Sequence, residues 1–406
     1  MEPPAYSYSM PAGVHAIPSS ELDLRSDAEI DAILLHPPPV KSEKNIWFFW
    51  HSGYANMHPY AQRTVRAYHR RFAPKGWTIR VLDLASPNSP GNVANFLDVN
   101  DPQLFPAAFR NGTMTGTYAR QHTSDLVRFP LLLAYGGVYA DVGLMPVGDL
   151  DALWETTVGS SSLHPTTHKR YEVISYQAGV DGEPDLTNYF LAARKENALF
   201  TRCHALFLAL WAEDGGRCST DGMHRSSLLR GLPLPGKAFS PDVQVALFDY
   251  IAQGQVVRMV MGTVDEQDGW DGPRYIRDHV YVMDYMSGSQ LINDLTAWDG
   301  TRAFNLMSLR VPGPGETESD DQKAARDIVE ACLSRSFAFK LAHGLIIAVL
   351  GETLGSLWRS HPGSDIVPGT YAHWLRYGMV HWTPDVLPQP VEFRMVTTYK
   401  NGPLLE

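Results

Sequence analysis

The sequence predicts an α/β fold in which a mostly parallel, Rossmann-like sheet is flanked by helices and followed by a helical C-terminal extension. Residues 45–50 (NIWFFW) form a continuous apolar run, which is typical of a strand buried on both faces. An amphipathic helix at 60–72 and an alternating segment at 77–84 come next. This order of strand, helix and strand is a βαβ unit, whose strands are parallel.

The remaining elements complete this pattern along the chain. Residues 86–117, rich in Asn, Pro and Gly, predict a long irregular loop over the carboxyl edge of the sheet. Further strands are expected at 171–177 and 281–285, and helices at 26–35, 189–211, 241–252, 322–335 and 336–359. We divide the chain into an N-terminal arm at 1–42, an α/β core at 43–260 and a C-terminal extension at 261–406 packed on that core.

Composition limits the class of protein. The net charge of −10 argues against a uniformly basic nucleic-acid-binding protein, and the three cysteines are far apart and lack metal spacing. The N-terminus has no basic and apolar signal sequence. The longest apolar run, 341–351, is shorter than the about 20 residues that span a bilayer. We therefore expect a cytoplasmic protein with no membrane or protein partner.

Candidate chemistry concentrates at 121–155, a predicted helix, strand and acidic loop. Loops at the carboxyl ends of strands bind ligands in open α/β sheets. Asp141 ends the strand, but Gly143 stands where a second carboxylate would complete a metal-binding pair. Asp125 and Arg128, three residues apart on the preceding helix, form either a surface pair or a site in which Arg128 orients Asp125.

A second group of carboxylates follows the strand. Asp151 and Glu155 are four residues apart on a helix expected to start at Asp149, so they share one face. Such a pair can act as a general base, a metal ligand or a clamp for a guanidinium. Equally, Asp149 can be an N-cap, and Asp151 can complement the helix dipole.

The dense positive patch is the helix face formed by Arg63, Arg66 and Arg70. This face suits contacts to phosphates, although a solvated helix face is the more common arrangement. The histidines lack zinc-site spacing, and nucleophile-elbow, Walker and dinucleotide-binding motifs are absent from the sequence.

The run SDLVRFPLLLAYGGVYADVG, with the upstream IWFFWHSG, resembles the sugar-transferase family that carries a DxD motif, and in particular fungal capsular polysaccharide synthesis-like proteins. The resemblance spans residues 45–211 and implies a GT-A-like fold. It also implies that Asp125 lies near a nucleotide and Asp141 at a metal. Gly143 leaves the DxD motif incomplete.

A second resemblance is to fungal arginine-containing cyclodipeptide synthases, which use aminoacyl-tRNAs and carry a DDxxE motif. Residues 151–155 (DALWE) have this spacing, with Ala152 in place of the second aspartate. The resemblance implies arginyl-tRNA and a second aminoacyl-tRNA as partners, with no bound cofactor. The degraded DxD motif, the missing membrane anchor and the basic helix face favour this hypothesis over sugar transfer.

Our leading hypothesis is therefore a tRNA-dependent synthase that forms a cyclic dipeptide from arginine and a second amino acid. Glu155 would deprotonate the attacking amine and Asp151 would bind the arginine guanidinium. Asp125, Asp141, Arg128 and Tyr139 would shape the substrate pocket, and Arg63, Arg66 and Arg70 would contact tRNA.

Two other hypotheses belong to different classes. One is a glycosyltransferase that acts on a cytosolic acceptor, with Asp141 as the remaining ligand of Mn²⁺ or Mg²⁺. The other is an inactive GT-A-like scaffold that only binds a partner. The sequence does not reveal the second amino acid, metal binding at the degraded motif, the oligomeric state, or the roles of the 86–117 loop and the C-terminal third.

Overall fold

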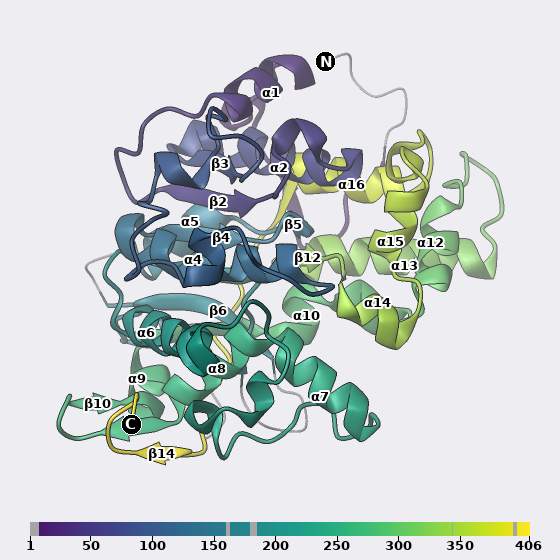
Figure 1. Cartoon of the computed structure of the whole chain (residues 1–406). Coiled ribbons are helices and arrows are strands. Elements are labelled where there is room, and N and C mark those ends of the chain that lie inside the picture. The colour runs from purple at the N-terminus through teal and green to yellow at the C-terminus, as the bar shows by residue number, and fades with distance from the viewer. Residues whose placement is uncertain (1–7, 160–162, 179–184, 343, 393–395) are drawn as a thin grey trace.

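A seven-stranded sheet forms the centre of the computed structural model, which describes residues 8–159, 163–178, 185–342, 344–392 and 396–406 (Figure 1). Its strands are β2 (Asn45–Phe49), β3 (Thr78–Leu82), β4 (Gly137–Ala140), β6 (Val173–Ala178), β7 (Asp185–Leu186), β8 (Phe190–Ala193) and β11 (Val280–Asp284). The order is β11-β6-β8-β4-β2-β3, and β7 pairs with β6. All strands run in one direction except β7 and β8, which are antiparallel to their neighbours.

Shorter strands and helices surround this sheet. The other strands are β1 (Val14–Ala16), β5 (Leu144–Pro146), β9 (Thr263–Asp265), β10 (Trp270–Asp271), β12 (Ala338–Lys340), β13 (Trp382–Pro384) and β14 (Lys400–Asn401). The helices up to α8 are α1 (Asp27–Leu35), α2 (Pro59–Phe72), α3 (Ala107–Arg110), α4 (Ala119–Tyr135), α5 (Leu150–Thr156), α6 (Ala198–Ala212), α7 (Pro241–Tyr250) and α8 (Ala252–Met261). Those that follow are α9 (Gly272–His279), α10 (Tyr285–Ser289), α11 (Leu291–Leu295), α12 (Gly300–Ser308), α13 (Asp320–Arg335), α14 (Leu345–Leu350), α15 (Leu354–Ser360) and α16 (Tyr371–His381).

Each face of the sheet has its own apolar core. Side chains alternate along β2, so Ile46 and Phe48 enter one core while Trp47 and Phe49 enter the other. Helices α2, α5, α13 and α16 contribute to the first core, and α4, α6 and α8 to the second. Burial on both faces explains the continuous apolar run of β2.

The C-terminal third packs against the earlier part of the chain. Strand β12 pairs with β5, β13 pairs with β1, and α16 contacts α2. Figure 1 shows α12 to α15 gathered beside α16 at one side of the sheet. The division into arm, core and extension stays a prediction, but these pairings explain how a distant segment reaches the central strands.

The predicted fold class is confirmed, and two predicted helices are wrong. Residues 189–211 begin with β8, because the chain turns at Glu196 (φ 59°) before Asn197 caps α6. Residues 336–359 contain β12, α14 and α15 instead of one helix. The positive φ angles of Gly344 (68°) and Gly351 (83°) interrupt a continuous helix there. Among the described residues, every helix lacks the length or the apolar character needed to cross a membrane.

The basic face of α2 is occupied by carboxylates of the same chain. Arg63 Nε donates to Asp365 Oδ2 at 3.0 Å, and Arg66 contacts Asp31 at 2.6 Å. Arg70 is 4% exposed and contacts Asp27 at 2.7 Å. The prediction that Arg63, Arg66 and Arg70 present a free positive surface is therefore wrong, because internal ion pairs neutralise them.

We expect Asp365→Asn to lower the free energy of unfolding by about 3 kcal/mol, because it leaves two partly desolvated arginines without their shared carboxylate. Asp365 is fully buried and also contacts Arg376 at 2.8 Å. Denaturant unfolding at pH 7 measures the change. The matched control is Asp27→Asn, whose side chain is 59% exposed, so its cost should stay below about 1 kcal/mol. Equal costs for the two variants would contradict this description of the helix face.

Candidate active site

The candidate site lies at the carboxyl edge of the sheet. The parallel strands β2, β3 and β4 end there, and the antiparallel β8 begins there. Asp141 directly follows β4, and its backbone N–H donates to the carbonyl of Tyr189 at 2.9 Å. The middle of α4 supplies Asp125 and Arg128 to the same edge. This is where open α/β sheets place ligand sites.

Arg128 is the centre of a group of polar side chains. Its Nη2 lies 3.0 Å from Asp125 Oδ1 and 3.2 Å from Asp141 Oδ1. Its Nη1 donates to the carbonyl of Asn188 at 2.6 Å. The guanidinium also lies over the Tyr139 ring, 4.7 Å from its centroid. The helix, β4 and the segment before β8 are thus joined through one side chain.

This group is buried, which decides between the two predicted arrangements of Asp125 and Arg128. Each residue is 5% exposed, so the pair is not a surface ion pair. Burial raises the pKa of Asp125, and Arg128 opposes that rise. Burial by itself would lower the pKa of Arg128, but Asp125, Tyr139 and Asp141 together raise it above its ordinary value. The guanidinium is therefore a permanent charge in the site.

Uncharged side chains hold Asp125 and Tyr139 in place around Arg128. Gln253 Nε2 donates to the backbone carbonyl of Asp125 at 2.5 Å, and Asn188 Nδ2 donates to Asp125 Oδ1 at 3.4 Å. The hydroxyl of Tyr139 lies 2.5 Å from Ser124 Oγ. Burial raises the pKa of Tyr139 to about 12, so this phenol stays neutral. Gln253 and Asn188 could not be predicted as site residues, because both come from distant segments that carry no motif.

Lys340 is the second cation of the site, and sequence reasoning missed it. Its Nζ lies 2.8 Å from Asp141 Oδ2 and 5.2 Å from the centroid of the Tyr189 ring. Strand β12 holds it there, because Lys340 is paired with Leu144 in the antiparallel ladder with β5. The sequence pattern predicts one long helix over 336–359, and such a helix gives no reason to place residue 340 beside Asp141.

Asp151 and Glu155 lie at the opposite edge of the sheet. Both contact Lys44 at 2.7 Å, and Asp151 also accepts from Trp77 Nε1 at 2.8 Å. Lys44 and Trp77 immediately precede β2 and β3, so they mark the amino ends of these strands. Asp149 caps α5, accepting from the N–H of Ala152 at 3.1 Å, which was one of the alternatives that the sequence left open. The expectation that Asp151 and Glu155 belong to one site with Asp141 is wrong, because β5 carries the chain away from that edge.

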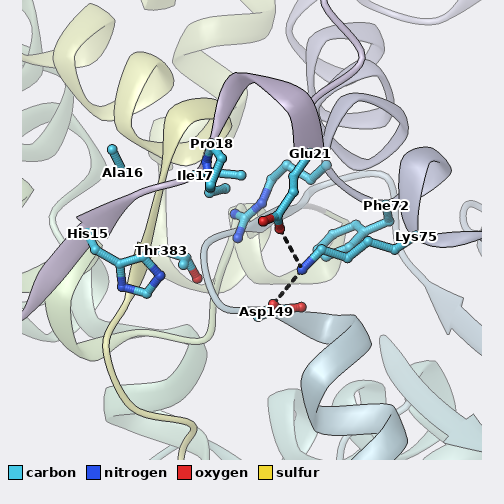
Figure 2. Close-up of a pocket in the computed structure, with 10 residues that line it drawn as sticks. His15, Ala16, Ile17, Pro18, Glu21, Phe72, Lys75, Asp149 and Thr383 are labelled. Carbon is cyan, nitrogen blue, oxygen red and sulfur yellow. Dashed lines mark hydrogen bonds and ion pairs between the residues drawn. The ribbon is translucent and has the colours of Figure 1, made fainter.

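A cavity of about 220 Å³ lies beside α5, away from the Asp141 edge (Figure 2). Several of its charged side chains are paired with groups of the same chain: Lys75 contacts Asp149 at 2.7 Å and Glu21 at 3.7 Å. Arg71 donates to the carbonyls of Val147 and Gly148 at 2.7 and 2.9 Å. These contacts join the N-terminal arm, α2 and α5, so the cavity is best explained by packing.

Comparison with known proteins identifies the class. The family model for capsular polysaccharide synthesis proteins matches residues 19–218. O-glycosyltransferase braB of Annulohypoxylon truncatum is 34% identical over 94% of this chain and 90% of its own length. O-glycosyltransferase PaGT of Phomopsis amygdali is 32% identical over 97% and 95% of the two chains. Glycosyltransferase afumC of Aspergillus fumigatus is 36% identical over 89% and 91%.

These relatives place the protein among glycosyltransferases, and the chain belongs to their family. Among solved structures, PaToxG glycosyltransferase matches 44% of this chain and 65% of its own at 12% identity and a TM-score of 0.27. The hypothesis of a cyclodipeptide synthase that uses arginyl-tRNA and a second aminoacyl-tRNA is wrong, because relatives along nearly the whole chain are glycosyltransferases. The roles of Glu155 and Asp151 in amine deprotonation and arginine binding, and that of Arg63, Arg66 and Arg70 in tRNA binding, were derived from that hypothesis. They are withdrawn with it.

Asp185 is a further titratable group, placed where β7 begins. It pairs with Ala178 at the carboxyl end of β6. Burial raises its pKa to about 7, and Arg258 opposes the rise. The folded protein therefore keeps a proton on Asp185 at pH values where the unfolded chain has lost it, and the contribution of this group to stability falls as pH rises from about 4 to 7.

We expect the stability of the Asp185→Asn variant, relative to the natural protein, to increase as pH rises, because asparagine does not titrate. Between pH 5 and pH 8 the free energy of unfolding of the variant, relative to the natural protein, should increase on the order of 2 kcal/mol. Denaturant unfolding at both pH values measures this difference. An unchanged difference would show that the folded protein does not raise the pKa of Asp185.

Proposed function

We propose that this protein transfers a sugar from a nucleoside diphosphate donor to a hydroxyl group of a small acceptor. The names of two relatives, O-glycosyltransferases braB and PaGT, support transfer to oxygen. The observation that carries the proposal is the group of Asp125, Arg128, Asp141 and Lys340 at the carboxyl edge of the sheet.

A nucleotide-sugar donor requires both negatively and positively charged side chains in its binding site. The hydroxyl groups of a ribose and a sugar donate hydrogen bonds, and a carboxylate accepts them. Asp141 suits this role because its side chain is 28% exposed, whereas that of Asp125 is only 8% exposed. Asp125 in turn fixes Arg128, so we assign Asp125 to positioning and Asp141 to direct contact with the donor.

The leaving group gains negative charge as the bond between the sugar and the diphosphate breaks. Fixed positive charges beside it stabilise that change, and in a water-poor site their effect is large. Arg128 and Lys340 both lie against Asp141, so a donor bound to this carboxylate meets cations on two sides. The Tyr139 ring packs against the Arg128 guanidinium, and Ser124 Oγ accepts a hydrogen bond from it.

The activity can be measured without knowing the acceptor, because water replaces it at a low rate. We expect the purified protein to release nucleoside diphosphate from at least one member of a panel of UDP- and GDP-sugars. Asp141→Asn should reduce kcat/KM about a hundredfold, since it removes a charged acceptor of hydrogen bonds.

Glu155→Gln is the matched control. It changes one carboxylate in the same way but at the opposite edge of the sheet, where Glu155 contacts Lys44 and is half exposed. Its kcat/KM should stay within about threefold of the natural protein. A large loss in Glu155→Gln together with full activity in Asp141→Asn would contradict the proposed location of the site.

A further inference from the structure

The degraded DxD motif has a cation at the place where a metal would be expected. The resemblance to DxD sugar transferases implies a divalent cation bound by two carboxylates, but Gly143 stands at the position of the second. Strand β12 runs beside this position: the N–H of Leu341 donates to the carbonyl of Gly143 at 2.8 Å. Lys340, one residue earlier, directs its ammonium to Asp141.

The described residues do not fit a metal ion. Asp141 Oδ1 faces Arg128 at 3.2 Å, and Oδ2 faces Lys340 at 2.8 Å. A divalent cation at this carboxylate would be repelled by both groups. Within the ranges that the structure describes, no cluster of three or more His, Cys, Asp and Glu side chains is arranged to hold a metal. The single carboxylate is thus already neutralised by the protein itself.

We propose that Lys340 takes the place of the metal, so that the enzyme binds the diphosphate of its donor through a fixed ammonium and works without a divalent cation. This inference rests on the proposed function. In the transfer, the bond from the sugar C1 to the diphosphate oxygen breaks and its electron pair stays on that oxygen. A new bond forms from C1 to the acceptor oxygen, and the acceptor proton passes to solvent. Nothing is oxidised or reduced.

The geometry of Lys340 suits this role. An ammonium has three donors, and Asp141 occupies one, which leaves donors for phosphate oxygens. Contact with the Tyr189 ring and the ladder of β12 restrict the side chain, so little conformational freedom is lost when a phosphate binds. The side chain of Lys340 is 13% exposed.

The test is equilibrium binding of UDP and of GDP to the full chain, measured by calorimetry in EDTA and again with Mn²⁺. We expect at least one nucleotide to bind in EDTA with a Kd within about threefold of the value in Mn²⁺. Lys340→Met should weaken binding in EDTA at least about tenfold, and Lys340→Arg should restore most of it. Thermal unfolding of each variant confirms that it is folded.

Lys75→Met is the matched control, because Lys75 also forms a partly buried ion pair with an aspartate, but beside α5. Its affinity for the nucleotide should be unchanged. Binding that appears only with Mn²⁺, or that Lys340→Met leaves intact, would overturn the role of Lys340 while the proposed function stands. Failure of both nucleotides to bind the folded protein under either condition would overturn the proposed function as well.

Discussion

The site depends on one buried guanidinium that two carboxylates share. Arg128 reaches Asp125 on its own helix and Asp141 at the end of β4, at 3.0 and 3.2 Å. A charge that is 5% exposed requires such partners, because an unpaired charge in the interior is strongly unfavourable. The same pairing fixes α4 against the carboxyl edge of the sheet. Stability of this edge and the geometry of the candidate site are therefore set by the same contacts.

Much of the fold could be predicted from local patterns. The unit of β2, α2 and β3 is encoded by a continuous apolar run, an amphipathic helix and an alternating strand, each visible within its own residues. Asp125, Arg128 and Asp141 were also predicted together, because a short segment joins the helix to the strand. The failures involve turns: the sequence pattern did not show the turns at Glu196 and Gly344, each of which lies between a strand and the helix that follows it.

The site was only partly predictable, because its members come from distant segments. Asp151 follows Asp141 by ten residues yet lies at the other edge, since β5 crosses between them. Lys340 is separated from Asp141 by 199 positions yet contacts it. Nearness in sequence therefore predicted that Asp151 belongs to the site of Asp141, which is wrong. The glycine at position 143 also argued against sugar transfer. In the structure, the pairing of β5 with β12 explains why the ammonium of Lys340 lies beside this position.

A crystal structure with bound UDP or GDP, whichever binds, grown in the presence of EDTA, tests the location of the donor most directly. Our proposals predict that the nucleotide lies at the carboxyl edge of the sheet, with a β-phosphate oxygen within hydrogen-bond distance of Lys340 Nζ. Binding of the nucleotide in the cavity beside Lys75 and Asp149, or at any other surface remote from Asp141, would contradict them.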